Sequence, residues 1–207
     1  MGTGWPLPEI SALGVTGGGN AKSVMGVVFR AAGSLLRQAP GVRRLPPKVA
    51  LPEAPSAKLP PMNTGDKPIW RNQAAPETLT ESARNTLAER IGIRVTEIGP
   101  DYLRATMPVN AHTHQPMGIL HGGASVALAE TVGSIAANLC VDIEKYVCVG
   151  QEINANHLRP VLSGLVTGTA RPLHIGGRSQ VWGIEIRDEN DKLVCVSRLT
   201  MAVVERK

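Results

Sequence analysis

The chain has 207 residues, of which 43% are hydrophobic, and it carries a formal net charge of +5. This length suffices for one ordinary domain with an appendage, and no run of 18 or more apolar residues predicts a membrane span. Residues 1–61 hold seven Lys or Arg and two Asp or Glu, and the remainder holds 15 of each, so the neutral main body lacks the basic excess that nucleic-acid binding requires.

The first 61 residues differ in composition from the rest, since they contain nine of the 16 prolines. RRLPPKVALPEAPSAKLPPM is typical of an extended, Pro-rich linker. Before it, AKSVMGVVFRAAGSLLRQ has apolar residues at helical spacing and predicts a short targeting or surface-binding helix. Alternatively, Met62 is the true start of the working protein. We therefore expect a basic extension over 1–61, disordered or outside the working protein, and one domain over 62–207.

From Met62 the sequence predicts a helix and two strands before a long polar loop. PETLTESARNTLAERIG, residues 76–92, is amphipathic, with Pro76 suited to a first turn and Gly92 to a helix end. GIRVTEIG and DYLRATMPV are predicted strands joined by a turn at Gly99 and Pro100. The loop NAHTHQPMGIL follows. Its two histidines have no third ligand at a suitable spacing, so we expect a solvated loop and no metal site.

A helix over 122–140 is apolar nearly all round, which is typical of a core helix. Four strand-like segments follow it: YVCVGQEINANHL, LSGLVTGTARPLHI, RSQVWGIEIRD and KLVCVSRLTMAVV. In RSQVWGIEIRD the apolar and charged residues alternate, as expected of an antiparallel strand with one covered face, and DENDK predicts a hairpin turn. The helix would span about 28 Å, so a curved sheet must wrap it. The expected fold class is α+β.

Glu130 is the only acidic residue between His121 and Val141, and no Lys or Arg lies in that range. Desolvation in an apolar helix disfavours the charged carboxylate, so either a partner such as Arg198 or His157 pairs with it or the group has a function. The glycines that open the helix allow close approach to its free N–H groups, which can bind a developing oxyanion. A carboxylate and an oxyanion site are the minimum for acyl-transfer hydrolysis.

Three stretches of the sequence carry a family resemblance: QPMGILHGGASVALAETVGS, EINANHLRP and RPLHIGGRSQVWGIEI. They resemble the hotdog-fold acyl-CoA thioesterases, above all the bacterial branch that hydrolyses aromatic acyl-CoA such as 1,4-dihydroxy-2-naphthoyl-CoA of menaquinone synthesis. The resemblance runs from about residue 69 to 204. It implies a hotdog fold, in which a curved antiparallel sheet wraps a long central helix, and dimers assembled into tetramers.

The resemblance also implies roles for individual residues. Glu130 would be the nucleophile or general base. Gln115 and the N–H of Gly122 would polarise the thioester oxygen, His121 would orient the site, and Ser134 would place the water or the carboxylate. The expected substrate contacts are His157 near the pantetheine arm, Ile135 and Asn138 along the acyl group, and Arg159, His174, Gly177, Arg178 and Ser179 at the nucleotide phosphates.

Two other enzyme or binding functions stay open at this point: a hotdog hydratase or dehydratase, and a non-catalytic module that binds acyl-CoA or an acyl-carrier protein. Coenzyme A would be part of the substrate, and no cofactor is expected. The odd number of unpaired cysteines predicts free thiols and a cytoplasmic location. Gly122 and Glu130 lie eight residues apart, about 12 Å along a helix, so we expect two chains to share each active site.

Overall fold

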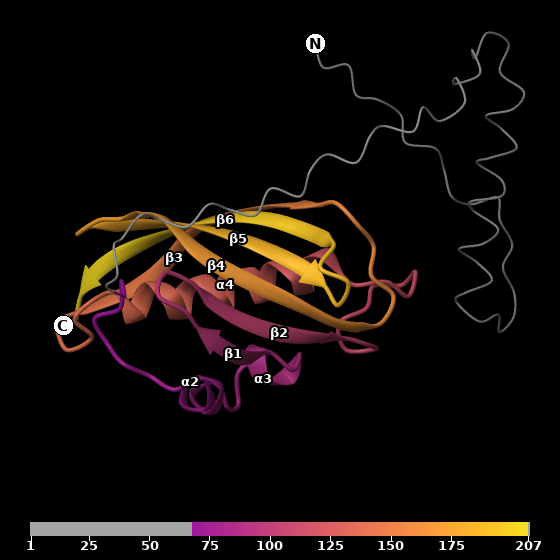
Figure 1. Ribbon diagram of the computed structural model, residues 1–207, viewed down its shortest axis with the longest axis horizontal. Helices are drawn as coiled ribbons and strands as arrows, with labels where there is room; N and C mark the ends of the chain where they lie inside the picture. Colours follow the sequence, from indigo (N-terminus) through magenta and orange to yellow (C-terminus); the bar gives the residue numbers. More distant parts are fainter. Residues whose placement is uncertain (1–67, 207) are drawn as a thin grey trace, which may run out of the picture. The chain divides into compact units, whose positions relative to one another are not determined.

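The computed structural model describes residues 68–206, so the expectations for residues 1–61 and for a boundary at Met62 lie outside the described residues. No helix in the described range is long and apolar enough to cross a membrane. The elements, drawn in Figure 1, are α2 (Pro76–Ser82), α3 (Leu87–Arg90), β1 (Arg94–Ile98), β2 (Leu103–Val109), α4 (Gly122–Leu139), β3 (Tyr146–His157), β4 (Gly164–Ile175), β5 (Ser179–Asp188) and β6 (Leu193–Glu205).

The predicted helix over 76–92 is two short helices, so that prediction was wrong in its middle. Asn85 adopts a left-handed backbone with φ of 60°, which interrupts a helix, and its N–H donates to the Glu89 carboxylate at 2.7 Å. Asn tolerates this conformation better than most residues. Gly92, with φ of 75°, follows α3 as expected of a helix stop.

Six strands form one antiparallel sheet in the order β1-β2-β4-β5-β6-β3. The sheet is not closed, and β1 and β3 are its two edges. Helix α4 packs against β2, β3, β4, β5 and β6, and Figure 1 shows it running along the sheet. The α+β hotdog architecture, the long helix and the four strands after it are thereby confirmed.

The core lies between α4 and the sheet. Leu128 and Val132 of the helix and Leu103, Ile184 and Leu199 of the sheet are almost completely buried. At one end Trp70 stacks on Trp182, with ring centroids 6.4 Å apart. Burial of such apolar surface is the main favourable term in folding, so the helix is held to the sheet along its length.

The sheet of one chain does not bury all of α4, contrary to the expectation from the apolar sequence. One stripe of the helix, at the spacing of a single helical face, is only half-buried. The stripe consists of Ala127, Thr131, Ser134, Ile135 and Asn138. A helix face of this composition is suited to contact with another protein surface.

Candidate active site

A pocket of about 350 Å³ lies at the start of α4. It contains four of the predicted site residues, namely Gln115, Gly122, His157 and Arg159. They come from the loop before α4, the first turn of the helix and the end of β3. The other lining residues carry no sequence signal that would have singled them out: Ile119, Leu120, Ser125, Leu158, Pro160 and Val194.

Two hydrogen-bond donors in this pocket have no acceptor among the described residues. The Gln115 side-chain oxygen accepts from the Met117 N–H at 2.7 Å, which orients the amide within a turn completed by Gly118 at φ 76°. The Gln115 NH₂ group donates to no atom within residues 68–206, and neither does the backbone N–H of Gly122. Both are therefore available to a ligand oxygen.

His121 and His157 both contact the start of α4. His121 caps α4, because its Nδ1 accepts from the Gly123 N–H at 2.8 Å. The His157 ring packs against Gly122, where a Cβ would stand 2.8 Å from Nε2. The first glycine of the HGG sequence therefore allows close contact between β3 and the helix terminus, in addition to any role in catalysis.

Glu130 is half-buried and lies against β3. A Cβ at Gly150 would stand 2.7 Å from its carboxylate oxygen, so a larger residue there would displace the carboxylate. The structural alternative, a pairing with Arg198 or His157, is not found, because the Glu130 carboxylate has neither a hydrogen bond nor an ion pair to any residue from 68 to 206. The full burial expected from the apolar sequence is also wrong for one chain, because Glu130 and the helix stripe beside it are only half-buried.

Three further predicted residues follow Glu130 along α4. The Ser134 hydroxyl contacts the Met201 sulfur at 3.8 Å, and Ile135 is half-buried against the core. The Asn138 side chain hydrogen bonds to the backbone of Cys148 and of Ser134. None of the three lines the pocket at the start of the helix.

The β4–β5 hairpin, which holds His174, Gly177, Arg178 and Ser179, lies at the end of the sheet near Glu130. Strand register places Gly150 beside Met201, Met201 beside Gln180, and Gln180 beside Ile175. His174, Gly177 and Arg178 are exposed, and Ser179 is half-buried. Within one chain the predicted residues therefore fall into two groups. One surrounds the start of α4, and the other extends from Glu130, in the middle of the helix, toward the C-terminal half of the helix and the β4–β5 hairpin.

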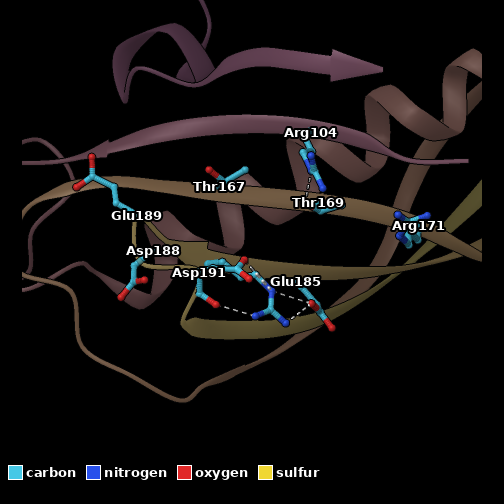
Figure 2. Close-up of a pocket in the computed structure, with 9 residues that line it drawn as sticks. Arg104, Thr167, Thr169, Arg171, Glu185, Asp188, Glu189 and Asp191 are labelled. Atoms are coloured by element: carbon cyan, nitrogen blue, oxygen red, sulfur yellow. Dashed lines mark hydrogen bonds and ion pairs between the residues drawn. The ribbon is translucent and has the colours of Figure 1, made fainter. Parts of the chain in front are cut away.

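A second pocket, of about 360 Å³, lies on the outer face of the sheet and contains none of the predicted residues (Figure 2). Its walls are formed by Arg104, Thr167, Thr169, Arg171, Glu185, Arg187, Asp188, Glu189 and Asp191. All three arginines are in ion pairs, Arg104 with Glu97, Arg171 with Asp101 and Arg187 with Glu185.

Glu185 and Arg187 correct the expectation of an uncovered outer face on β5, because they are only 9% and 8% exposed. The guanidinium donates to Glu185 at 2.8 Å and to the Asp191 carbonyl in the following turn at 2.8 Å. These bonds hold the two side chains together on the outer face of the sheet. The charged side chains on this face pair with one another, so their presence is explained by the stability of the fold.

The three cysteines are free, as expected, and all three are buried. Burial raises the pKa of the Cys140 thiol to about 12, and nearby Cys148 adds to the rise. Burial also raises the pKa of Cys148 and of Cys195 to about 11. Thiolates are scarce at neutral pH under these conditions. Between residues 68 and 206 no three His, Cys, Asp or Glu side chains gather as a metal site would require.

Comparison with known proteins connects this geometry to a family. The model of the thioesterase superfamily matches residues 117–195. The 1,4-dihydroxy-2-naphthoyl-CoA hydrolase of Escherichia coli strain K12 is 50% identical over 136 residues, which are 66% of this chain and 99% of that protein.

Solved structures give the same result. A thioesterase from Haemophilus influenzae is 50% identical, with a TM-score of 0.65 over 66% of this chain and 95% of that one. Two crystal structures of a Staphylococcus aureus thioesterase are 36% identical, with TM-scores of 0.57 and 0.55 over 58% and 56% of this chain, and 99% and 97% of theirs. One carries a glutamate-to-alanine change at its position 47, the other a glutamine-to-alanine change at its position 32. The chain belongs to the thioesterase superfamily, has the hotdog fold and is a thioesterase.

Proposed function

We propose that this thioesterase hydrolyses aromatic acyl-CoA to the free acid and CoA, with Glu130 as the reacting carboxylate and Gln115 and Gly122 as the oxyanion donors. The observation that carries the proposal is the combination of an unpaired, half-buried carboxylate with two donors that no described residue uses. Such preorganised groups are costly for stability and useful for catalysis.

Two routes satisfy this geometry. In one, the Glu130 carboxylate attacks the thioester carbon, expels the CoA thiolate and forms an anhydride that water then hydrolyses. In the other, Glu130 removes a proton from a water molecule that attacks the same carbon. Both consume one thioester and one water and yield one acid and one thiol. In both, the negative charge on the carbonyl oxygen is stabilised by the Gln115 NH₂ and the Gly122 N–H.

Two chains would form each site. Gly122 and Glu130 are about 12 Å apart along the axis of α4, and a Glu side chain recovers only about 4 Å of that by leaning toward the N-terminus. On β3, His157 contacts Gly122 and Gly150 contacts Glu130. These two strand residues are seven positions, or about 23 Å, apart. A second chain related by a two-fold axis would place its Glu130 near the first chain's Gln115.

The molecule offers the surfaces that such a pairing needs. The half-buried stripe of α4 and the open edge of β3 lie on the part of the chain that carries Glu130. A second copy would cover both. Further association of dimers into tetramers follows from the family resemblance, and we place the reaction in the cytoplasm, where free thiols are expected.

The relatives support the proposed catalytic residues and the proposed substrate class. In the S. aureus thioesterase, the substituted glutamine and glutamate are fifteen positions apart (32 and 47), which is also the separation of Gln115 and Glu130. The E. coli relative is named for an aromatic acyl-CoA substrate. Arg159, in the pocket, and the hairpin with His174 and Arg178 offer positive or polar groups for the nucleotide phosphates of CoA.

The test is a panel of thioesters, with release of free thiol followed colorimetrically. We expect kcat/KM for benzoyl-CoA and 1,4-dihydroxy-2-naphthoyl-CoA to exceed that for hexanoyl-CoA by tenfold or more. The same aryl group on an acyl-carrier protein tests the alternative carrier. Preference for the aliphatic thioester would contradict the aromatic assignment, and saturable binding without thiol release would contradict hydrolysis.

A further inference from the structure

Asn138, in the last full turn of α4, uses its side-chain amide as a clamp on β3. Its oxygen accepts from the Cys148 N–H at 2.9 Å, and its NH₂ donates to the Cys148 carbonyl at 3.1 Å. The NH₂ also donates to the carbonyl of Ser134 at 2.9 Å. One side chain thus satisfies both backbone polar groups of a strand residue while bonded to its own helix.

The clamp acts on the open edge of the sheet. In the β3–β6 ladder Cys148 lies opposite Val203, whose N–H donates away from β3, to the Arg178 carbonyl. Cys148 and Val203 therefore form a non-hydrogen-bonded pair, and the Cys148 backbone groups face outward. Without Asn138, the backbone of this part of β3 would be hydrogen bonded only to β6 among the described residues, and weaker contacts of the Cys148 sulfur with Ala137 and Gln180 would remain.

The clamped residue lies two positions before Gly150, the residue against which the Glu130 carboxylate rests. The ladder with β6 is interrupted between Gly150 and Glu152, where Gln151 is an extra residue. A bulge of this kind bends a strand and weakens its pairing locally. The contact between Gly150 and Glu130 thus lies between a bulge on one side and the clamp on the other.

We infer that Asn138 is a positioning residue for hydrolysis: by holding Cys148 to α4 it fixes the Gly150 backbone as a wall beside the Glu130 carboxylate. This inference rests on the proposed role of Glu130. A shift of this wall by about 1 Å would release the carboxylate from its attacking position, and misplacement on that scale costs about 100-fold in rate. Substrate binding through the CoA arm would be little affected.

Three variants test the inference. Asn138→Ala removes the clamp, and we expect kcat to fall tenfold or more while KM changes less than threefold. Asn138→Asp keeps the acceptor for the Cys148 N–H but sets a carboxylate oxygen against two carbonyls. When protonated, the new carboxyl can again donate and accept. We therefore expect its kcat, divided by that of the wild type at each pH, to rise as the pH falls from 8 to 5, whereas the ratio for Asn138→Ala stays constant.

Asn72 provides a matched control. Its NH₂ donates to the carbonyls of Asn138, Leu139 and Val141 and so stabilises the same helix end without touching β3. Asn72→Ala should lower Tm by several degrees and leave kcat near that of the wild type. An equal fall in kcat for Asn72→Ala and Asn138→Ala would show that general loosening of the helix end is responsible and would overturn the inference.

Two other outcomes would also overturn it: kcat within twofold of the wild type for Asn138→Ala, or a pH-independent ratio for Asn138→Asp. Failure of the proposed function is distinguished by measuring the wild type and Glu130→Ala in the same assay. If the wild type releases no thiol, or Glu130→Ala keeps full turnover, the catalytic assignment itself fails. If both behave as expected and Asn138→Ala is normal, only the positioning role fails.

Discussion

Glu130 combines two properties that rarely occur together in a side chain needed only for stability. The residue is half-buried, yet no described residue bonds to its carboxylate. A carboxylate in this position loses part of its hydration without gaining a hydrogen bond in return, which is unfavourable for folding. The free energy lost at this position is explained if the carboxylate acts on a substrate.

Glu130→Ala should therefore abolish turnover without harming the fold. Loss of the nucleophile or general base should lower kcat by about 10²–10⁴-fold. Tm should stay the same or rise slightly, because no hydrogen bond is lost. Thiol release and thermal unfolding monitored by circular dichroism measure the two effects.

Glu152→Ala is the control, since Glu152 is an exposed glutamate of β3 whose side chain bonds to Asn154 and to no other residue between 68 and 206. It should leave both kcat and Tm unchanged. A Glu130→Ala protein that unfolds, or that keeps near-normal kcat, would contradict the catalytic role and favour a structural one.

At the scale of elements, contact between α4 and β3 determines where the carboxylate lies. Asn138 joins them at Cys148, Gly150 touches Glu130, and His157 packs on Gly122. The strand thus follows the helix from its last turn to its first. Substitutions in β3 should therefore change the position of the Glu130 carboxylate, although β3 and Glu130 are not neighbours in sequence.

Gly150→Ala should reveal the contact between Gly150 and Glu130 by lowering both Tm and kcat. The added Cβ would stand 2.7 Å from the Glu130 oxygen, so we expect a loss of Tm and a large fall in kcat. In a Glu130→Ala background the same substitution meets no carboxylate, and the loss of Tm should largely disappear. Unfolding of the four proteins in a double-mutant cycle measures the coupling. Equal losses of Tm in both backgrounds would show that the two residues are not in contact.

How well the sequence predicts an element depends on what stabilises that element. Helix α4 and strands β3 to β6 have long apolar patterns, and burial against one another decides their structure. The helix over 76–92 fails at Asn85, where one left-handed residue outweighs an amphipathic pattern. Glu130 stands out because it is charged in an apolar helix. Gly150 and the Asn138 clamp could not be found, because they depend on which residue of β3 lies opposite the helix.

At the scale of the whole molecule, the proposed site residues of one chain lie too far apart to act together. The proposed oxyanion donors and Arg159 lie at the start of α4, and Glu130 lies in the middle of the helix, on the side of the β4–β5 hairpin. The open stripe of α4 is the surface on which a second copy would join them.

Mixing two inactive variants should restore activity if sites are shared. One is Glu130→Ala, and the other carries both Gln115→Ala and His121→Ala. In a mixed dimer one site inherits both defects and the other neither, so random exchange should give about a quarter of wild-type activity. Exchange is verified with distinguishable tags on the two variants. Absence of recovery despite exchange would mean that each site is built within one chain.

Burial of the three cysteines should make the stability of the whole fold depend on pH. Their pKa values in the folded chain are about 11 to 12, against 9.0 for an ordinary thiol. The unfolded chain would lose these protons above pH 9 and the folded chain would keep them, so the free energy of unfolding should fall as the pH rises from 9 toward 11. Urea unfolding at pH 8 and 10.5 checks this, with a smaller fall expected for Cys195→Ala.

The same burial separates two kinds of thiol in one solution. Hydrolysis of a CoA thioester liberates a small, exposed thiol, whereas the three protein thiols are enclosed and protonated at neutral pH. A reagent that reacts with thiolates will therefore count product molecules during turnover and detect the enzyme only as it unfolds. One titration can report catalysis in its early phase and loss of the native state in its late phase.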